Sequence, residues 1–301
     1  MKKVLSISLG SSTRDHTTEA DFLGEHFWIS RQGTNGDFEK ALQLYREYDG
    51  QVDAFGVGGT EFYQLVAGRR YYWRDARRIR EAIKISKVGD GNGLKHLLAP
   101  YALQALEEHG IKLEGKQVLQ TTAVDRYGMA KALTEAGCDV VFGDFMFTLG
   151  LPIPVRGMRA LHILAALALP VLTQLPFSFF YSLGEEQEGP PATKYTHYYE
   201  WADIIVGDFI QIRSNMPDDL TGKIIITNTT TARNFEELQE RNLHLLVTTT
   251  PRLEGRSFGT NVMEAVCRCL VDKPDDQITA ADIVELIERI PLKPQVHVLS
   301  E

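Results

Sequence analysis

The sequence predicts an α/β protein with an N-terminal α/β substrate domain and a Rossmann-like domain built on a doubly wound parallel sheet. Short apolar runs alternate with amphipathic helical segments, which is typical of parallel sheets covered by helices. The chain has 301 residues, more than one average domain, and 44% of them are apolar, enough for a sizeable core. We expect domains over 1–112 and 113–272, and a segment over 273–301 whose helix returns to the first domain.

The expected first domain begins with a strand. The opening MKKVLSISL has two lysines, as a signal peptide would, but its apolar run is short and alternates like a strand. Further predicted elements follow in chain order: the strand HFWIS, a helix over 37–48, the strand VDAFGVGG, a hairpin turning at Ala67 and Gly68, a helix over 74–83, a glycine-rich loop and a long helix over 94–109.

The expected second domain opens at Gly115 and repeats the strand–helix alternation. Its predicted strands lie at 118–121, 139–143, 203–207, 223–228 and 243–249, and the last two are mostly β-branched or Leu, as in strands buried on both faces. Predicted helices lie at 126–136, 194–201, 232–241 and 258–271. A final helix over 280–290 follows the expected N-cap Thr279.

The charge balance argues against nucleic acid as a partner. With 40 acidic and 32 basic residues the formal charge is −8, which repels phosphate backbones. Arginines do cluster between 69 and 80, in RRYYWRDARRIR, but Asp75 and Glu81 accompany them. We expect a solvated helix face with salt bridges there.

The cysteines predict no metal site. Of the three, Cys267 and Cys269 fall on one expected helix, where a separation of two residues turns their side chains about 200° apart. An odd number of thiols without close spacing is typical of a reducing cytoplasm, so we expect a cytoplasmic protein.

One segment, 161–183, has no Asp, Glu, Lys or Arg over 23 residues and is long enough to cross a bilayer. Pro170 and Pro176 would break such a helix twice. We expect no membrane partner, but a buried helix ending near 169 and then an extended segment feeding a core or a homodimer interface. An interfacial membrane segment is the alternative. The insertion 145–200 has no predicted role.

The first turn of the second domain lacks the glycines of a dinucleotide-binding turn. The three positions that are usually Gly fall on Thr121, Ala123 and Arg126. Hydroxyls of Thr121 and Thr122, the N–H groups at the helix start and the Arg126 guanidinium could hold phosphates instead. The alternative is a strand–helix–strand unit that binds no dinucleotide.

Polar residues at other strand ends complete the expected cofactor site. Asp144 ends the strand after the turn, where a carboxylate can accept hydrogen bonds from both ribose hydroxyls, which favours NAD over NADP. A strand-end Asp that caps the next segment is the alternative. We also expect Asp208, Asn228 and Thr229 to face the nicotinamide ribose, with Asn261 as a donor at a helix start.

The segments GDGNGLK, GKQVLQTTAVDRYGMAKALTEAGCDVVFGD, WADIIVGDF and GRSFGTNVMEA together resemble bacterial proteins labelled quinate 5-dehydrogenase, which are similar to shikimate and quinate dehydrogenases. The resemblance covers nearly the whole chain. It implies oxidation of a ring hydroxyl with a nicotinamide cofactor, using a Lys and an Asp. Asp90 matches the Asp; the Lys motif is absent, and Lys87 substitutes for it by position, beside Lys84 and Lys95.

Two functions remain open from the sequence. The first is an NAD-dependent oxidoreductase of the quinate/shikimate dehydrogenase type that acts on a small hydroxylated carboxylate, with Asp90 and Lys87 as the catalytic pair. The alternative is a non-catalytic nucleotide- or metabolite-binding protein that keeps the two-domain cleft.

Overall fold

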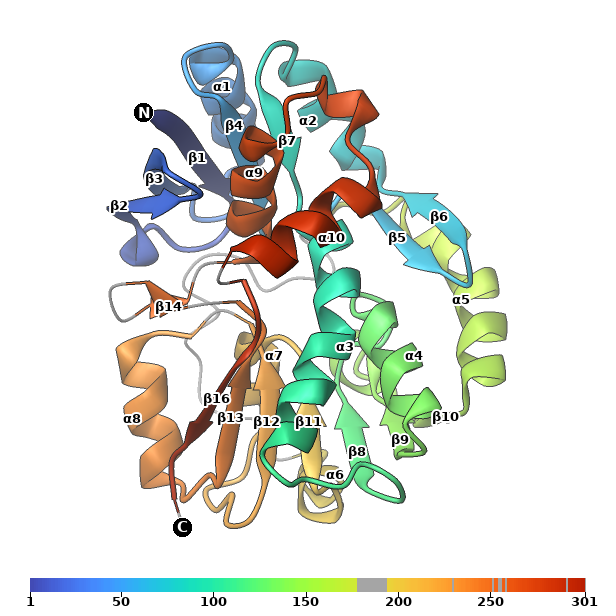
Figure 1. Cartoon of the computed structure of the whole chain (residues 1–301). Helices are drawn as coiled ribbons and strands as arrows, with labels where there is room; N and C mark the ends of the chain where they lie inside the picture. The colour runs from blue at the N-terminus through green and yellow to red at the C-terminus, as the bar shows by residue number, and fades with distance from the viewer. Residues whose placement is uncertain are drawn as a thin grey trace.

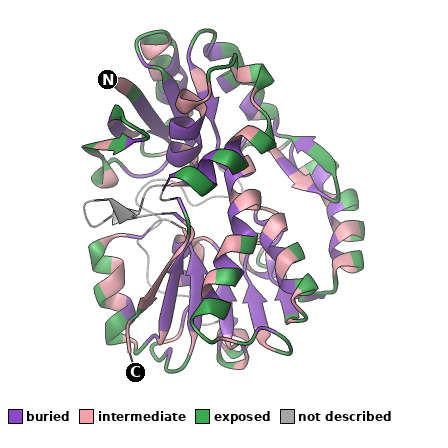
Figure 2. Ribbon diagram, in the orientation of Figure 1, coloured by how far each residue is buried: buried purple, intermediate pink, exposed green. Residues whose placement is uncertain are grey.

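The structure, a computed structural model, describes residues 1–177, 194–228, 230–250, 252–253, 256–257, 259–290 and 292–300. Two β-sheets lie one above the other, and the chain crosses between them more than once (Figure 1). Buried residues concentrate on the strands and on the helix faces turned toward them (Figure 2).

The N-terminal sheet has the order β2-β3-β1-β4-β7. Its strands are β1 (Lys2–Ser8), β2 (His16–Phe22), β3 (Glu25–Gly33), β4 (Ala54–Gly58) and β7 (Lys87–Gly89). β1 pairs in parallel with β3 and β4, and β4 with β7, whereas the edge strand β2 is antiparallel to β3.

Helices cover both faces of this sheet. Leu5 and Ile7 of β1 pack with α1 (Phe38–Tyr48) and α2 (Arg74–Ala82). Val4, on the opposite face, packs with α9 (Thr260–Leu270). The expected second domain, 113–272, therefore includes a helix that packs on the first sheet, because the chain returns there after β13.

The predicted hairpin is confirmed as β5 (Tyr63–Val66) and β6 (Arg69–Tyr72). Its two turn residues both have positive φ, 51° at Ala67 and 78° at Gly68. This matches the two-residue turn whose twist suits a hairpin.

The second sheet has the order β10-β9-β8-β11-β12-β13-β16. Its strands are β8 (Gln117–Gln120), β9 (Asp139–Phe142), β10 (Val155–Arg156), β11 (Ile204–Val206), β12 (Ile224–Thr227), β13 (Leu245–Thr248) and β16 (Gln295–Val298). The strands from β9 to β13 are parallel, and β10 and β16 add antiparallel edges.

The order of the parallel strands corrects one detail of the expected fold. Numbered along the chain they run 2-1-3-4-5, which is the flavodoxin-like order, and not the 3-2-1-4-5-6 order of dinucleotide-binding sheets. The general expectation of a two-sheet α/β protein is confirmed. Local patterns predict the strands but not their neighbours, because strand order depends on which face each crossover covers.

Helices also sandwich the second sheet. Its helices are α3 (Asn92–Glu108) and α4 (Tyr127–Glu135) on one face, and α6 (Thr196–Trp201), α7 (Phe209–Arg213) and α8 (Ala232–Glu240) on the other. The helix α10 (Ala280–Arg289) begins with a capping box between Thr279 and Asp282, and packs with α9 and α3. Short strands β14 (Arg252–Leu253) and β15 (Arg256–Ser257) precede α9.

The apolar segment forms α5 (Met158–Leu172), with Pro170 inside its last turn. We expected this helix to be buried, which is wrong for one of its two faces. Leu161, Ala165 and Leu169 are buried, whereas Leu167 is 71% exposed. Positions 178–183 of the expected extended segment lie outside the described residues. Among the helices that the structure describes, none is long and apolar enough to span a bilayer.

Candidate functional site

A cavity of about 430 Å³ lies between the two sheets. Residues after β1 and β4 line it from the N-terminal sheet, and residues after β8, β11 and β12 line it from the second sheet. Because all of these positions follow the carboxyl ends of parallel strands, the cavity is where open α/β sheets bind ligands. The inner faces of α5 and of the turn Asp144–Thr148 make its apolar wall.

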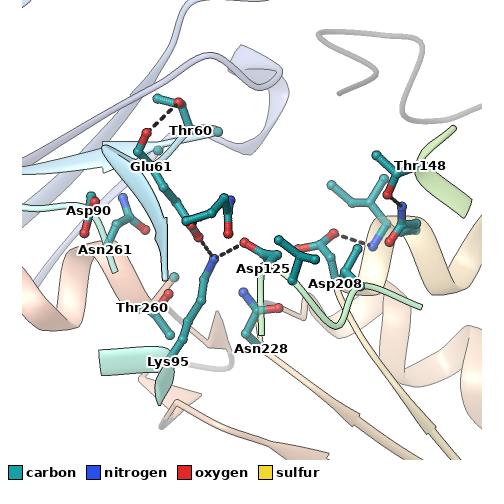
Figure 3. A pocket seen from close by; sticks show the side chains of 18 of the residues that line it. Thr60, Glu61, Asp90, Lys95, Asp125, Thr148, Asp208, Asn228, Thr260 and Asn261 are labelled. Carbon is teal, nitrogen blue, oxygen red and sulfur yellow. Dashed lines mark hydrogen bonds and ion pairs between the residues drawn. The ribbon is translucent and has the colours of Figure 1, made fainter. Parts of the chain in front are cut away.

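A chain of paired charges lies at this cavity, and Figure 3 shows its part from Glu61 through Lys95 to Asp125. The Lys95 ammonium, in the first turn of α3, donates to Glu61 and, at 2.9 Å, to Asp125. Asp125 also pairs with the Arg126 guanidinium, which lies 3.5 Å from the Asp208 carboxylate. Glu61 follows β4 of the N-terminal sheet, whereas the other four lie on α3 or after β8 and β11, so the chain joins the two walls. We call these five residues the ion-pair chain.

Burial and neighbouring charges set the protonation of the ion-pair chain. Glu61 is 4% exposed, and burial, reinforced by the Asp125 charge, raises its pKa well above the ordinary value although Lys95 opposes this. Burial also disfavours ionised Asp125, but Lys95 and Arg126 outweigh it and hold the pKa of Asp125 well below its usual range. Burial acts against the charge of Lys95 as well, yet Asp125 and Glu61 keep its pKa raised.

The turn expected to hold phosphates is already occupied by a side chain. The Asp144 carboxylate accepts from the backbone N–H groups of Ala123 at 3.1 Å and Val124 at 2.9 Å. Burial raises the pKa of Asp144 to about 6, against these hydrogen bonds. A pyrophosphate would meet a carboxylate where it needs donors. The turn therefore does not fit a dinucleotide pyrophosphate.

The Arg126 guanidinium likewise binds other side chains of the protein. Besides Asp125, its guanidinium donates to Thr122 Oγ1 at 3.2 Å and to Asn228 Oδ1 at 3.0 Å. Thr121 is fully buried, and its N–H donates to Val206 O at 2.8 Å. A Cβ on Gly207 would lie 2.0 Å from Thr121 Oγ1, so this threonine is a packing residue between β8 and β11.

The remaining expected cofactor residues lie around the same cavity. Asp208 lines it and also caps α7 through Ile210 N. Asn228 and Asn261 line it too, and Asn261 Nδ2 donates to Ser6 Oγ at 3.0 Å. Thr229 lies outside the described residues. The expectation that ligands bind beyond the carboxyl ends of the strands thus predicted where the cavity lies, but not the role of each residue.

The two expected catalytic residues are not brought together. Asp90 lines the cavity, but its carboxylate accepts from Asn92 N at 3.1 Å, within its own turn, and from Phe62 N at 2.8 Å, in the segment before β5. Lys87 Nζ donates to Arg268 O at 2.8 Å and Val271 O at 2.7 Å, at the end of α9. Lys87 is not among the residues that line the cavity, because its ammonium caps a helix end.

Sequence reasoning missed several residues of the site. Glu61, Asp125, Gln64 and Gln211 received no role, and Lys95 was noted only for its position. An acid two residues after the pair Gly58 and Gly59 was a usable signal, since glycines let a loop approach closely. Within the described residues, no three His, Cys, Asp or Glu side chains gather as a metal site.

The fold and the cavity define a two-domain α/β protein with a polar cleft between its sheets. The chain belongs to the family described as "Domain of unknown function (DUF8754)", whose model matches residues 93–299. A second model, "Domain of unknown function (DUF8753)", matches residues 3–90. A search of curated proteins gives no match.

Solved structures resemble the chain weakly. A galactofuranose binding protein has 12% identity and a TM-score of 0.38, covering 99% of this chain and 95% of that one. The periplasmic binding protein component of the arabinose ABC transporter from Shewanella sp. ANA-3 has 11% identity and a TM-score of 0.35, covering 96% and 95%. These scores are too low to carry an argument about function.

The expected membership among quinate 5-dehydrogenases is wrong. The family models that match the chain are the two domains of unknown function. The geometry agrees: Lys87 and Asp90 form no pair, and Asp144 fills the turn. The interpretation as an oxidoreductase of the quinate or shikimate type depended on this membership and is wrong as well.

Proposed function

We propose that the protein binds, without chemical conversion, a small uncharged molecule carrying several hydroxyl groups, such as a sugar or a cyclic polyol. The observation that carries this proposal is the ion-pair chain across the cleft. Each of its cations is paired with carboxylates of the same chain, so the ion-pair chain has no excess positive charge to offer a phosphate or a dicarboxylate.

Hydrogen-bonding capacity remains for an uncharged ligand. Gln64, 3% exposed on β5, donates its amide N–H to Glu61, and Gln211 of α7 donates its amide N–H to Phe147 O at 3.2 Å. Because a carbonyl oxygen only accepts, the Gln211 amide orientation is fixed and its Oε1 must face the other way.

Both amide oxygens, Gln64 Oε1 and Gln211 Oε1, have no partner among the described residues, and both side chains line the cleft from opposite walls. A buried acceptor without a donor costs about 1–3 kcal/mol. Both oxygens are covered in this conformation, so a ligand hydroxyl removes that cost once the amide has turned its oxygen toward the cleft. The apolar wall, including Phe145 and Phe147, suits the C–H face of a ring.

The test is a binding screen by thermal shift and calorimetry. Neutral pentoses, hexoses and cyclic polyols are compared with their phosphorylated and carboxylated counterparts and with NAD. We expect at least one neutral compound to stabilise the protein by about 2.7 kcal/mol at 100 times its dissociation constant, and its charged counterpart to bind more weakly.

A matched pair of variants links such binding to the cleft. Gln211→Leu should weaken binding by about tenfold or more, because it removes an acceptor that is otherwise satisfied by the ligand. Gln104→Leu, on the exposed face of α3, is the control and should bind normally. Tighter binding of the charged counterparts, or equal affinity of the two variants, would contradict the proposal.

A further inference from the structure

The outer face of α5 exposes large apolar side chains in one stripe. Ile163, Leu167 and Val171 are 52%, 71% and 65% exposed, and their spacing of four residues places them on one side of the helix. The only Asp, Glu, Lys or Arg between Met158 and Leu172 is Arg159, which begins the same stripe. A helix on the surface of a globular protein normally turns polar residues outward.

Arginines lie on α5 itself and on the two elements that contact it. The hairpin β5–β6 packs on the inner face of α5, where Val66 and Tyr71 contact Ala165 and Leu169. In Figure 1 the hairpin and α5 lie side by side at one edge of the molecule. Arg69 extends over the Tyr71 ring at 4.9 Å, and neither Arg69 nor Arg159 has a carboxylate partner among the residues that the structure describes.

The basic helix α2 continues this surface at the other end of α5. Arg74 N donates to Thr173 O at 2.9 Å, so the arginines of α2 begin next to the last turn of α5. The carboxylate in this helix start, Asp75, is turned inward, 3.6 Å from Arg74 Nε and 3.3 Å from Phe177 N. We call the stripe together with Arg69, Arg74 and Arg159 the α5 surface.

The charge of the α5 surface favours one occupant over another. The chain as a whole carries −8, yet this edge presents arginines beside apolar groups. A second copy docked by a two-fold axis would bring together Arg69 and Arg159 of both copies, for which the described residues supply no carboxylate partner. Anionic lipid headgroups would complement them, while the stripe entered the boundary between headgroups and acyl chains.

We propose that the α5 surface docks the protein peripherally on an anionic lipid bilayer. With 15 residues α5 is shorter than the roughly 20 that a spanning helix needs, so the contact lies in the plane of the membrane. This proposal is independent of the ligand in the cleft. It joins the two sequence features, the apolar segment and the arginine cluster, that the cleft leaves without a role.

The test is co-sedimentation with phosphatidylcholine vesicles, with and without phosphatidylglycerol, at low and high salt. We expect binding that requires phosphatidylglycerol and weakens with salt. Leu167→Glu should lower the partition coefficient by about tenfold or more, and Arg69→Glu by several-fold. Ile85→Glu and Arg46→Glu are the controls, since Ile85 is 76% exposed away from α5 and Arg46 lies on the exposed face of α1.

Circular dichroism confirms that each variant is folded, which is expected because all four positions are exposed. Absence of binding to both kinds of vesicle overturns the proposal, and so does equal binding of Leu167→Glu and Ile85→Glu. A dimer by analytical ultracentrifugation that Leu167→Glu dissociates would identify a second copy as the occupant and overturn the lipid assignment.

Discussion

Replacing Lys95 with Met tests whether the ion-pair chain holds the two walls of the cleft together. The change keeps the length of the side chain and removes its charge. Glu61 and Asp125, whose side chains are 4% and 17% exposed, then lose their common cation. Removing one partner of a buried ion pair typically costs about 3–5 kcal/mol.

The expected cost is smaller for Lys95→Met, because both acids keep another partner. Asp125 keeps Arg126, and Glu61 keeps Asn92 Nδ2 at 2.8 Å. Glu61 can also take up a proton, because burial already raises its pKa. We therefore expect a loss of about 2–4 kcal/mol in the free energy of unfolding at pH 8. The loss should be smaller at pH 5 than at pH 8, because the raised pKa lets Glu61 take up a proton more readily as the pH falls, and a neutral acid needs no cation.

Urea unfolding of both proteins at the two pH values measures this difference. The double variant Glu61→Gln with Lys95→Met should recover part of the stability, since a neutral amide replaces the unpaired acid. Lys40→Met, an exposed lysine on α1, is the control and should stay within about 0.5 kcal/mol. A Lys95→Met effect no larger than that of the control would refute the reasoning.

Two further predictions concern the packing around the cleft. Burial, with the Asp90 charge, raises the pKa of Glu264 to about 7, so its contribution to stability is present below pH 4.5 and is lost as the pH rises through about 7. Glu264→Gln should therefore reduce the loss of unfolding free energy between pH 4.5 and about 7, by up to about 3 kcal/mol. Denaturation curves measured over a pH series test this, and the same dependence of unfolding free energy on pH in both proteins would contradict it. A Cβ at Gly128 would lie 2.8 Å from His96 Cα, so Gly128→Ala should lower the free energy of unfolding by about 1–3 kcal/mol; a melting temperature equal to that of the unmodified protein would count against the close contact of α3 and α4.

The sequence predicted the interior of the fold better than its edges. The strands β11, β12 and β13 are runs of β-branched or other apolar residues that are buried throughout, and such runs are visible locally. The edge strands β10 and β16 were missed. β10 has two residues, and in β16 no residue is fully buried, so neither gives a periodic signal.

The candidate site shows a different limit. Asp208 and Asn228 follow strand ends, and the general rule for α/β sheets placed them correctly beside the cleft. Glu61 and Lys95 are 34 residues apart, and no local spacing couples them. Asp144 had two interpretations because a carboxylate at a strand end can bind a ribose or cap the next segment. In the structure it does not cap the next segment but accepts from the N–H groups of Ala123 and Val124, in the turn after β8.

The residues that replace the glycines of a phosphate-binding turn also explain why the cleft suits an uncharged ligand. Thr121 fills the space beside Gly207, and Asp144 takes the donors that a phosphate would use. Arg126, at the third position, lies between Asp125 and Asp208 and cannot leave them without exposing two carboxylates to each other's repulsion. A ligand phosphate would therefore compete with the protein's own carboxylates for Arg126. A hydroxyl group, which both donates and accepts, can add to such a network without breaking any of its ion pairs.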